Sequence, residues 1–281
     1  MGLRIAVAAV SFTWNFTRSM LAELKKCAGP EHELIEVGLV RREDDKFLHQ
    51  RFGSILTMQP KVDAVISLTF GLALHEVNDF RHEGIPIITV DEEGVGSSEV
   101  SCDNVKAGYL AGRHLIETGR KALALLAGPS VAPGAHYNAV RRRQGFERAL
   151  AEAGMRLPPE RFASCIEYSR KDGVSALESF LKSGQPIDGI FCAAGDAAAG
   201  GILAAAREHK LAIPADLAVV GFDDLPTAAI SDPPLTTIRQ PTTRIAQEAL
   251  RLATQKENFA AILEKPETIH LEPTLVKRGS T

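Results

Sequence analysis

Short hydrophobic runs recur along the chain, and each is followed by a stretch with hydrophobic residues at helical spacing. The runs are rich in Val, Ile and Ala and nearly continuous, which is typical of parallel strands buried on both faces. The pattern predicts strands at Arg4–Val10, Glu33–Val37, Ala64–Thr69, Pro86–Val90, Ala122–Ala127, Ala163–Glu167, Gly189–Ala193 and Leu217–Gly221. It predicts helices over 16–28, 43–56, 71–83, 104–118, 136–153, 171–183, 196–209 and 243–255. This alternation predicts an α/β fold with right-handed crossovers.

The ends of two predicted helices carry recognisable signals. Asp103 directly precedes the helix over 104–118, where its carboxylate can accept hydrogen bonds from the exposed N–H groups of the first turn. Gly119 follows the end of that helix, and Gly154 follows the helix over 136–153. Glycine is the residue that best adopts the left-handed conformation with which helices commonly end.

The sequence also indicates two similar halves. Val62–Ile66 resembles Ile187–Phe191, and each string has an Asp at its second position. Further on, Ile85–Val90 runs into an acidic pair that begins at Asp91, and Leu217–Phe222 runs into one that begins at Asp223. Ligands of open parallel sheets bind beyond the carboxyl ends of the strands. We therefore expect two doubly wound sheets that present both acidic pairs to one cleft.

Composition narrows the class of protein. Of the 281 residues, 45% are hydrophobic and 24% are charged, with a net charge of -3, which is ordinary globular composition. A nucleic-acid-binding domain usually carries a basic excess, which this chain lacks. No apolar run reaches the about 20 residues that span a bilayer. The four cysteines are far apart and form no CxxC pair, so we expect a reduced, cytoplasmic protein that does not bind membranes.

Common catalytic and cofactor signatures are missing. Gly94-Val95-Gly96 opens like a dinucleotide-binding loop, but Glu99 stands where the third glycine belongs. The stretch 128–134 has roughly phosphate-loop spacing but lacks the Lys-Ser/Thr that contacts phosphate. There is no GxSxG motif, and the eight histidines are scattered without the convergence that metal binding needs. We expect no enzyme activity, no metal and no cofactor.

The remaining chemistry fits a ligand with many hydroxyl groups. Only one residue of the run Arg141–Arg143 can face inward, because consecutive helical residues point about 100° apart. An inward arginine needs acidic or hydroxyl partners, which the acidic strand ends could supply. Trp14 and Tyr168 each follow a predicted strand, where an aromatic ring could cover an apolar ligand face. Phe16 fits core packing equally well.

Several longer strings, taken together, resemble one protein family. They are DNVKAGYLAGRHLIETGRKALALLAGP at 103–129, RRQGFERALAEAGM at 142–155, IPADLAVVGFDDLP at 213–226, DPPLTTIRQPTTRIAQEA at 232–249 and LEPTLVKR at 271–278. The chain resembles, over essentially its whole length, the effector-binding core of the lactose/galactose-repressor (LacI/GalR) family of bacterial transcription regulators. The last three strings, in order and correctly spaced, are the most specific.

The resemblance implies a fold like that of periplasmic binding proteins of the first type. Two doubly wound subdomains would be joined by three crossing segments, with a small ligand between them. The resemblance places the first subdomain at 1–99 plus 241–268 and the second at 100–240 plus 269–281. The crossings would fall near Val100–Asp103 and Ile238–Pro241.

The resemblance also assigns ligand-binding residues, position by position: Trp14, Phe16, Asp91, Arg142, Tyr168, Asp196 and Asp223. Arg142, three residues before Gly-Phe, would be the main polar anchor. Two departures from the family pattern affect the identity of the ligand. Gly195 stands where the family usually has Asn, and the first loop reads SFTWNF where Asn-Pro-Phe-Phe is common.

The resulting hypothesis is the ligand-sensing core of a transcriptional regulator. Its effector would be a sugar or related polyol, or else a nucleobase. Binding would act on operator DNA through an N-terminal head that this chain lacks, in a homodimer without a tetramerising tail. A sugar-binding protein of an ABC transporter shares the fold and is the alternative. A sugar-active enzyme is a third hypothesis, but paired carboxylates serve binding as well as catalysis.

Overall fold

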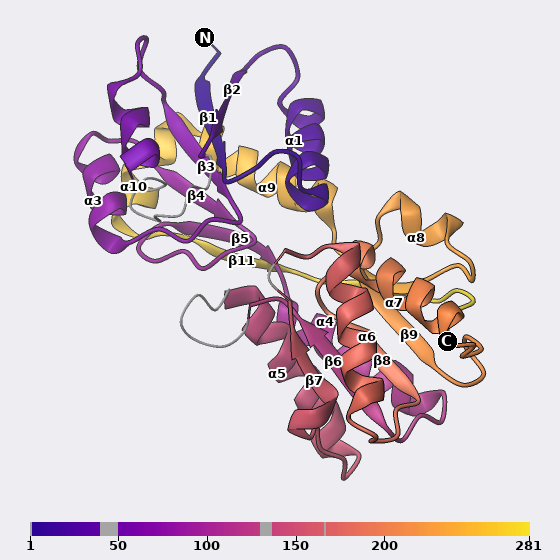
Figure 1. Ribbon diagram of the computed structural model, residues 1–281. Helices are drawn as coiled ribbons and strands as arrows, with labels where there is room; N and C mark the ends of the chain where they lie inside the picture. Colours follow the sequence, from indigo (N-terminus) through magenta and orange to yellow (C-terminus); the bar gives the residue numbers. More distant parts are fainter. Residues whose placement is uncertain (1, 40–49, 130–136, 166) are drawn as a thin grey trace. The chain divides into compact units, whose positions relative to one another are not determined.

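The computed structural model describes residues 2–39, 50–129, 137–165 and 167–281, and the chain divides into two compact units (Figure 1). The first unit comprises Met1–Cys102 and Pro241–Leu271, and the second comprises Asp103–Gln240 and Glu272–Thr281. The chain therefore passes between the units three times. The boundaries predicted after residues 99 and 268 fall inside two strands that pair with each other, so both strands stay whole in the first unit.

The first unit is built on a six-stranded sheet in the order β11-β5-β4-β3-β1-β2. All of its strand pairs are parallel. Its hydrophobic runs are buried throughout β3 and β4, because helices cover both faces of the sheet. The strands are β1 (Arg4–Ala9), β2 (Glu33–Gly38), β3 (Ala64–Leu68), β4 (Ile87–Val90), β5 (Ser98–Cys102) and β11 (Thr268–Leu271).

Two separate hydrophobic cores lie on the two faces of this sheet. One contains residues of α1 (Asn15–Ala28), α9 (Thr242–Thr254) and α10 (Phe259–Glu264). The other contains α3 (Leu74–His82) and the 3-10 helix η1 (Ser54–Thr57). A further 3-10 helix, η3 (Lys256–Asn258), joins α9 to α10. The first unit thus draws one of its helical layers from a segment far away in the sequence.

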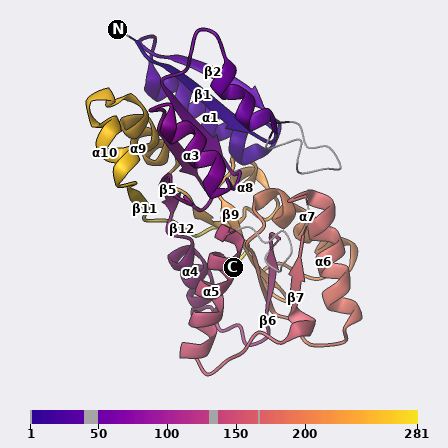
Figure 2. The ribbon, with the colours of Figure 1, turned by 90° about the vertical axis from the view of Figure 1, so that its left-hand side faces the viewer.

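The second unit repeats this topology, as Figures 1 and 2 allow the reader to follow. Its sheet has the order β12-β10-β9-β8-β6-β7, in which β3 and β4 of the first unit correspond to β8 and β9. These strands carry the similar strings found in the sequence, so the predicted duplication is confirmed. Only β12 pairs antiparallel among the described strands. The strands are β6 (Leu123–Ala127), β7 (Phe162–Ser164), β8 (Gly189–Cys192), β9 (Ala218–Asp223), β10 (Thr236–Arg239) and β12 (Thr274–Val276).

Two close helix pairs cover the second sheet. They are α4 (Asn104–Glu117) with α5 (Tyr137–Glu152), and α6 (Arg170–Lys182) with α7 (Asp196–Glu208). Glycines let the backbones touch: a Cβ at Gly145 would lie 1.8 Å from the carbonyl oxygen of Val105, and one at Gly173 would lie 1.8 Å from that of Ala198. The short α8 (Pro226–Ile230) and the 3-10 helix η2 (Pro159–Arg161) complete the unit.

The predicted fold class is confirmed, with differences in the shorter elements. Asp103 caps α4 by accepting a hydrogen bond from the backbone N–H of Lys106 at 2.9 Å, and Gly119 and Gly154 follow their helices with positive φ, as predicted. The prediction missed β5, β10, β11, β12, α8 and α10. The predicted helix over 43–56 lies largely outside the described residues, which include only its end at 50–56.

Candidate functional site

In the second unit, the predicted site residues lie at or near the carboxyl ends of neighbouring strands. Asp223 is the last residue of β9, Asp196 follows β8 as the first residue of α7, and Tyr168 follows β7. Arg142 belongs to α5, and its Nη1 donates a hydrogen bond to the carbonyl oxygen of Ala193 just beyond β8, at 2.9 Å. The fold therefore brings all four residues predicted for this unit to one edge of one sheet.

Arg142 is almost fully buried but keeps part of its hydrogen-bonding capacity. Its Nε donates to the carbonyl oxygen of Asn138 at 3.3 Å, and its guanidinium carbon lies 4.1 Å from the ring centroid of Phe222 in β9. These contacts fix the guanidinium across the ends of β8 and β9. Among the described residues, its Nη2 has no hydrogen-bond partner.

Asp223 lies within electrostatic range of Arg142 without forming an ion pair with it among the described residues. Burial raises the pKa of Asp223 to about 6, although the Arg142 charge and a hydrogen bond from Gln240 act in the opposite direction. Gln240 Nε2 donates to Asp223 Oδ1 at 2.7 Å. The other oxygen, Oδ2, has no hydrogen-bond partner within the described part of the chain and lies beside Gly195, where a Cβ would approach it to 3.0 Å.

Unlike Asp223, Asp196 has both carboxylate oxygens hydrogen-bonded within the protein. Its Oδ1 accepts a hydrogen bond from the hydroxyl of Thr237 and its Oδ2 accepts one from the backbone N–H of Leu225, each at 2.7 Å. The residue is buried, and this burial, together with the charge of Asp223, raises the pKa of Asp196 to about 8. Since both oxygens already serve the protein, Asp196 links α7 to β10 and to the segment that follows β9.

Tyr168 lies beside the carboxyl end of β6. It is partly buried, packs against the core beneath α6 and α7, and has a φ of 56°. Its phenol lies over the backbone at the end of β6, because a Cβ at Gly128 would come within 2.3 Å of Tyr168 Oη. The glycine is thus required for this placement of the ring.

In the first unit, the three predicted residues follow β1 and β4. Trp14, which precedes α1, leaves 41% of its surface exposed, whereas Phe16 is partly buried against the core beneath α1 and α9. Asp91 directly follows β4, is partly buried and has a φ of 57°. Trp14 is therefore partly open to solvent, Asp91 is only partly exposed, and the contacts of Phe16 favour core packing.

Gln240 is a site residue that sequence reasoning missed. It is buried, it holds Asp223, and its Oε1 has no hydrogen-bond partner among the described residues. It lies in the string LTTIRQP, which supports the family resemblance but does not by itself assign a role to the glutamine. A glutamine after a strand carries no signal of its own, because its side chain is equally common on exposed surfaces.

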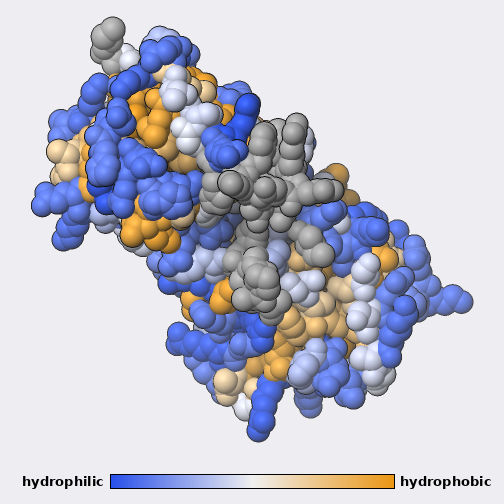
Figure 3. All heavy atoms as spheres, turned by 60° about the vertical axis from the view of Figure 1, so that its left-hand side comes forward, coloured by the Kyte–Doolittle hydropathy of each residue, from blue (hydrophilic) through white to orange (hydrophobic). Residues whose placement is uncertain are grey.

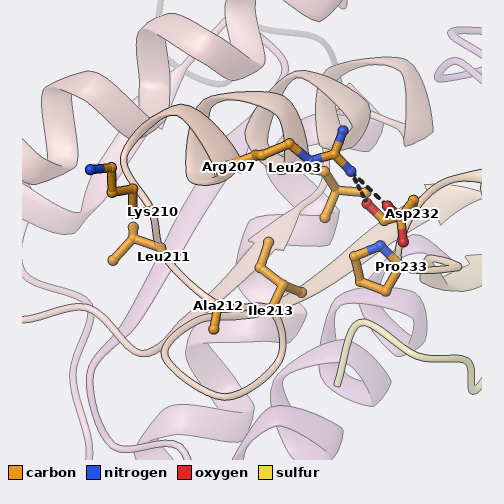
Figure 4. A pocket seen from close by; sticks show the side chains of 8 residues that line it. All are labelled: Leu203, Arg207, Lys210, Leu211, Ala212, Ile213, Asp232 and Pro233. Atoms are coloured by element: carbon orange, nitrogen blue, oxygen red, sulfur yellow. Dashed lines mark hydrogen bonds and ion pairs between the residues drawn. The ribbon is translucent and has the colours of Figure 1, made fainter.

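A separate pocket of about 350 Å³ lies elsewhere on the second unit (Figure 4). Leu203, Ile213 and Pro233 line it, and Arg207 donates to the carboxylate of Asp232 at its rim at 2.9 Å. It sits by the C-terminal half of α7, whereas Asp196 begins that helix. No predicted site residue lines it, and its lining mixes apolar side chains with the charged residues Arg207, Lys210 and Asp232.

Three further observations concern metal binding, membrane-spanning helices and the surface of the described residues. No group of three or more His, Cys, Asp or Glu side chains in the described part of the chain could hold a metal ion. None of the described helices is both long and apolar enough to cross a membrane. On the face drawn in Figure 3, hydrophilic residues cover much of each unit and hydrophobic ones appear in smaller groups.

Comparison with known families identifies the fold. Residues 113–281 match the family described as Periplasmic binding protein-like domain. The chain belongs to this family. Its relatives include the HTH-type transcriptional repressor PurR of Erwinia tasmaniensis, which is 32% identical over 205 residues, or 71% of this chain and 57% of the repressor. The repressor CytR of Escherichia coli K12 is 34% identical over 182 residues, or 65% of this chain and 51% of CytR.

Solved structures of the family agree with this assignment. The chain superposes on the transcriptional regulator CelR in complex with cellobiose with a TM-score of 0.83 and 26% identity, covering 99% of this chain and 84% of CelR. A LacI-family transcriptional regulator from Silicibacter pomeroyi shares the fold with a TM-score of 0.79 at 22% identity, covering 99% of this chain and 98% of that one. The resemblance to the LacI/GalR family is thus confirmed. The chain spans about half the length of the curated relatives it matches.

Proposed function

We propose that this chain is the ligand-sensing core of a bacterial transcriptional regulator. Its relatives are transcriptional repressors of the HTH type, and the part of them that it matches has the fold of a ligand-binding domain. The effector is a small polar molecule, a sugar or related polyol or else a nucleobase. The partners of the complete regulator are operator DNA, bound through a helix-turn-helix segment, and a second copy of the protein. The place of action is the cytoplasm.

The observation that carries this proposal is the unpaired arrangement of Arg142 and Asp223. The guanidinium Nη2 can still donate and the carboxylate Oδ2 can still accept, while neighbouring groups hold both side chains in place. A ligand hydroxyl can accept from the arginine and donate to the aspartate at once. Charge-assisted hydrogen bonds of this kind are the stronger ones in proteins, so the pair suits recognition of an uncharged polar molecule.

The other predicted residues take different parts in the proposed site. Tyr168 and Trp14 are the aromatic residues of the proposed site, and Asp91 is its acidic residue in the first unit. Asp196 acts through its neighbours, because both of its oxygens are already bonded. Phe16 supports the loop that carries Trp14. The small Gly195 leaves space beside Asp223, which suits a ligand with a bulkier group at this position than an asparagine would admit.

Regulation follows if the ligand binds one arrangement of the two units better than another. A ligand shifts a conformational equilibrium only by its difference in affinity for the two states. Three chain crossings join the units, so a ligand that contacts both can change their relation and, through it, the DNA-binding segment. Because paired heads read half-sites at a fixed spacing, a change in head spacing alters affinity for the operator.

The decisive experiment is the substitution Arg142→Ala. We expect it to weaken binding of sugars or nucleosides by about 2 kcal/mol, or roughly 30-fold, the size of a lost charged hydrogen bond. Isothermal titration calorimetry measures this after a thermal-shift screen has selected the ligand. The matched control is Arg143→Ala, since Arg143 bonds Glu147 at 2.8 Å on the same helix and should not affect affinity. Equal losses in both variants would refute the role of Arg142.

Two alternatives make different predictions. A transporter's sugar-binding protein would also bind the selected ligand, but the complete gene product would then carry an export leader and would bind no promoter DNA. An enzyme would change the ligand chemically, which mass spectrometry after prolonged incubation would detect. The repressor relatives favour regulation over both, and we expect the ligand to be recovered unchanged.

A further inference from the structure

Glu99 places a carboxylate inside the first unit, in strand β5. Its side chain is almost fully buried, while Val100 and Cys102 of the same strand belong to the hydrophobic core beneath α1 and α9. A buried carboxylate is unfavourable unless other groups bond it, and hydrophobic residues in place of a buried ion pair often leave a protein as stable or more stable. The stability of the sheet alone therefore does not explain this glutamate. In the sequence, it interrupts the glycine motif that begins at Gly94.

One oxygen of Glu99 binds the two strands by which the chain leaves the first unit. Oε1 accepts a hydrogen bond from Ser101 Oγ at 2.8 Å and lies 3.0 Å from His270 Nε2. Ser101 in β5 and His270 in β11 are paired in the parallel register. The first unit ends at Cys102 in one crossing and at Leu271 in another, so each bonded residue stands directly before the last residue of the unit. The Glu99 carboxylate thus joins the starts of two of the three crossings.

The other oxygen of Glu99 binds the β4–β5 loop, residues 91–97. Oε2 accepts a hydrogen bond from the backbone N–H of Gly94 at 3.3 Å. The contact is close, because a Cβ at Gly94 would lie 3.0 Å from Glu99 Cβ and 2.7 Å from the carbonyl oxygen of Ser97. The loop begins with Asp91, which belongs to the proposed ligand site. One carboxylate therefore contacts both a loop of that site and the strands that lead out of the unit.

We infer that Glu99 is a positioning residue that couples the β4–β5 loop to the first and third crossings. The inference rests on the proposed function and adds a route by which a ligand acts on the crossings. Coupling between sites can run through hydrogen-bond and ion-pair networks that have two arrangements. A ligand that fixes the loop favours the arrangement in which Gly94 bonds Glu99, and the same carboxylate then holds both strands. By reciprocity, a change at either crossing alters the loop.

The first experiment tests the link in the protein without ligand. His270→Leu removes a partner of Glu99 at the third crossing, and hydrogen exchange measured by NMR reports on the Gly94 amide in the loop. We expect this amide to exchange about 5-fold faster, the effect of weakening one hydrogen bond, because the carboxylate is held less firmly. The matched control is Thr268→Val, two residues away on the same side of β11, which should leave exchange of the Gly94 amide unchanged.

A double substitution shows whether the effect travels through Glu99. Glu99→Gln keeps the size of the side chain and removes the charge that attracts His270 and the Gly94 N–H. We expect Glu99→Gln to speed exchange of the Gly94 amide by itself, and His270→Leu to add no further increase in that background. Increases that multiply would show that the two residues act independently, and the inference would be wrong. His270 is partly exposed, so its substitution tests the link even if Glu99→Gln does not fold.

The second experiment tests the route with a ligand. The probe is whichever of D-ribose, D-galactose, cellobiose, adenosine and cytidine binds the unaltered protein most tightly, and it is used at saturation. We expect it to slow exchange of the backbone amides at all three crossings, next to Cys102, Gln240 and Leu271. In Glu99→Gln the slowing should be lost at the first and third crossings and persist at the second. The second crossing is the internal control, because Gln240 bonds Asp223 instead.

The outcomes separate this inference from the proposed function. If Arg142→Ala loses affinity for the probe while Glu99→Gln keeps the slowing at both crossings, Glu99 transmits nothing and the proposed function stands. If His270→Leu leaves the Gly94 amide as slow as Thr268→Val does, the link is absent and the inference is wrong. If none of the five probes binds, the proposed class of effector fails, and the two substitutions in β11 still decide whether Glu99 links the loop to the crossings.

Discussion

Asp223 and Asp224 are adjacent in the sequence and serve different purposes. The buried carboxylate of Asp224 forms ion pairs with Arg239 at 2.6 Å and with Arg278 at 2.7 Å. Asp223 has one oxygen held by Gln240 and one without a partner among the described residues. Both residues have positive φ, and their carboxylates meet different partners. The first is available to a ligand, and the second anchors the end of β10 and the C-terminal segment.

Asparagine substitutions should separate these two roles. We expect Asp223→Asn to weaken ligand binding by about 2 kcal/mol, because a charged acceptor is lost, with little change in unfolding. Asp224→Asn should instead lower the free energy of unfolding by about 2 kcal/mol, since two arginines lose their charged partner. Calorimetry and urea denaturation measure the two quantities. If Asp224→Asn weakened ligand binding more than Asp223→Asn did, Asp224 and not Asp223 would be the residue that faces the ligand.

Binding should also depend on pH through Asp223. Burial raises its pKa to about 6 in the free protein, so the carboxylate gains a proton as the pH falls through that value. A protonated carboxyl loses the charge that strengthens its bond to a ligand hydroxyl. We therefore expect affinity for a neutral sugar to decline below about pH 6 in the unaltered protein. Asp223→Asn should bind weakly at every pH, and a parallel decline in that variant would assign the titration to another group.

The sequence could predict residues with a characteristic signature but not those defined by geometry. Arg142 was recognisable because it lies three residues before Gly-Phe, and Asp223 because it belongs to GFDD at 221–224. Tyr168 was recognisable as an aromatic residue that follows a predicted strand. The sequence shows Glu99 only as the residue that interrupts a glycine motif, since its contacts with the β4–β5 loop and with β11 form in the folded chain. Gln240 depends on a contact with a residue 17 positions away, which only the folded chain defines.

At the level of secondary structure, the longer buried strands could be predicted from the sequence and the short strands could not. The eight predicted strands all exist, because continuous runs of Val, Ile and Ala report burial on both faces of a sheet. The four missed strands are three to five residues long and contain mainly polar or alternating residues, as in Ser98–Cys102. Their pairing is fixed by the sheets that they extend, so a local pattern could not reveal them.

The α6–α7 pair offers a test of how closely these helices pack. A Cβ at Gly201 would lie 2.0 Å from the carbonyl oxygen of Arg170, whereas one at the adjacent Gly200 would have no neighbour nearer than the Arg170 guanidinium at 3.5 Å. We expect Gly201→Ala to lower the free energy of unfolding by about 2–3 kcal/mol, because the helices must separate. Gly200→Ala should raise it by up to about 1 kcal/mol through helix propensity. Urea denaturation that ranked the two variants equally would contradict this helix crossing.

The start of α7 provides a test of stability against pH. An aspartate in the unfolded chain releases its proton near pH 4, whereas burial raises the pKa of Asp196 in the fold to about 8. Between these values the folded state binds more protons than the unfolded state, so Asp196 makes the free energy of unfolding fall as the pH rises. In Asp196→Asn, the amide can still accept from Leu225 N–H and can donate to Thr237. We expect this variant to lose less stability between about pH 5 and pH 8, and parallel curves would contradict the raised pKa.

The interleaved chain path decides which pieces of the protein can fold alone. The first unit takes its last 31 residues, Pro241–Leu271, from beyond the second unit. That segment supplies α9, whose buried residues Ile245, Ala249 and Leu252 belong to the same core as β1 and α1. A fragment of residues 1–102 would therefore leave one face of its sheet uncovered. The exposed hydrophobic surface would oppose folding, because apolar burial is its main driving force.

We expect residues 1–102 alone to show no cooperative thermal transition by circular dichroism. Residues 1–102 joined to 241–271 by a flexible Gly/Ser linker should unfold cooperatively, since that chain restores the helix beneath the sheet. The matched control carries Ile245→Asp and Leu252→Asp in the same fusion. It should resemble the short fragment, because two charges would then lie in the core. Cooperative unfolding of 1–102 by itself would show that these residues form an independent domain and that α9 is not needed for its folding.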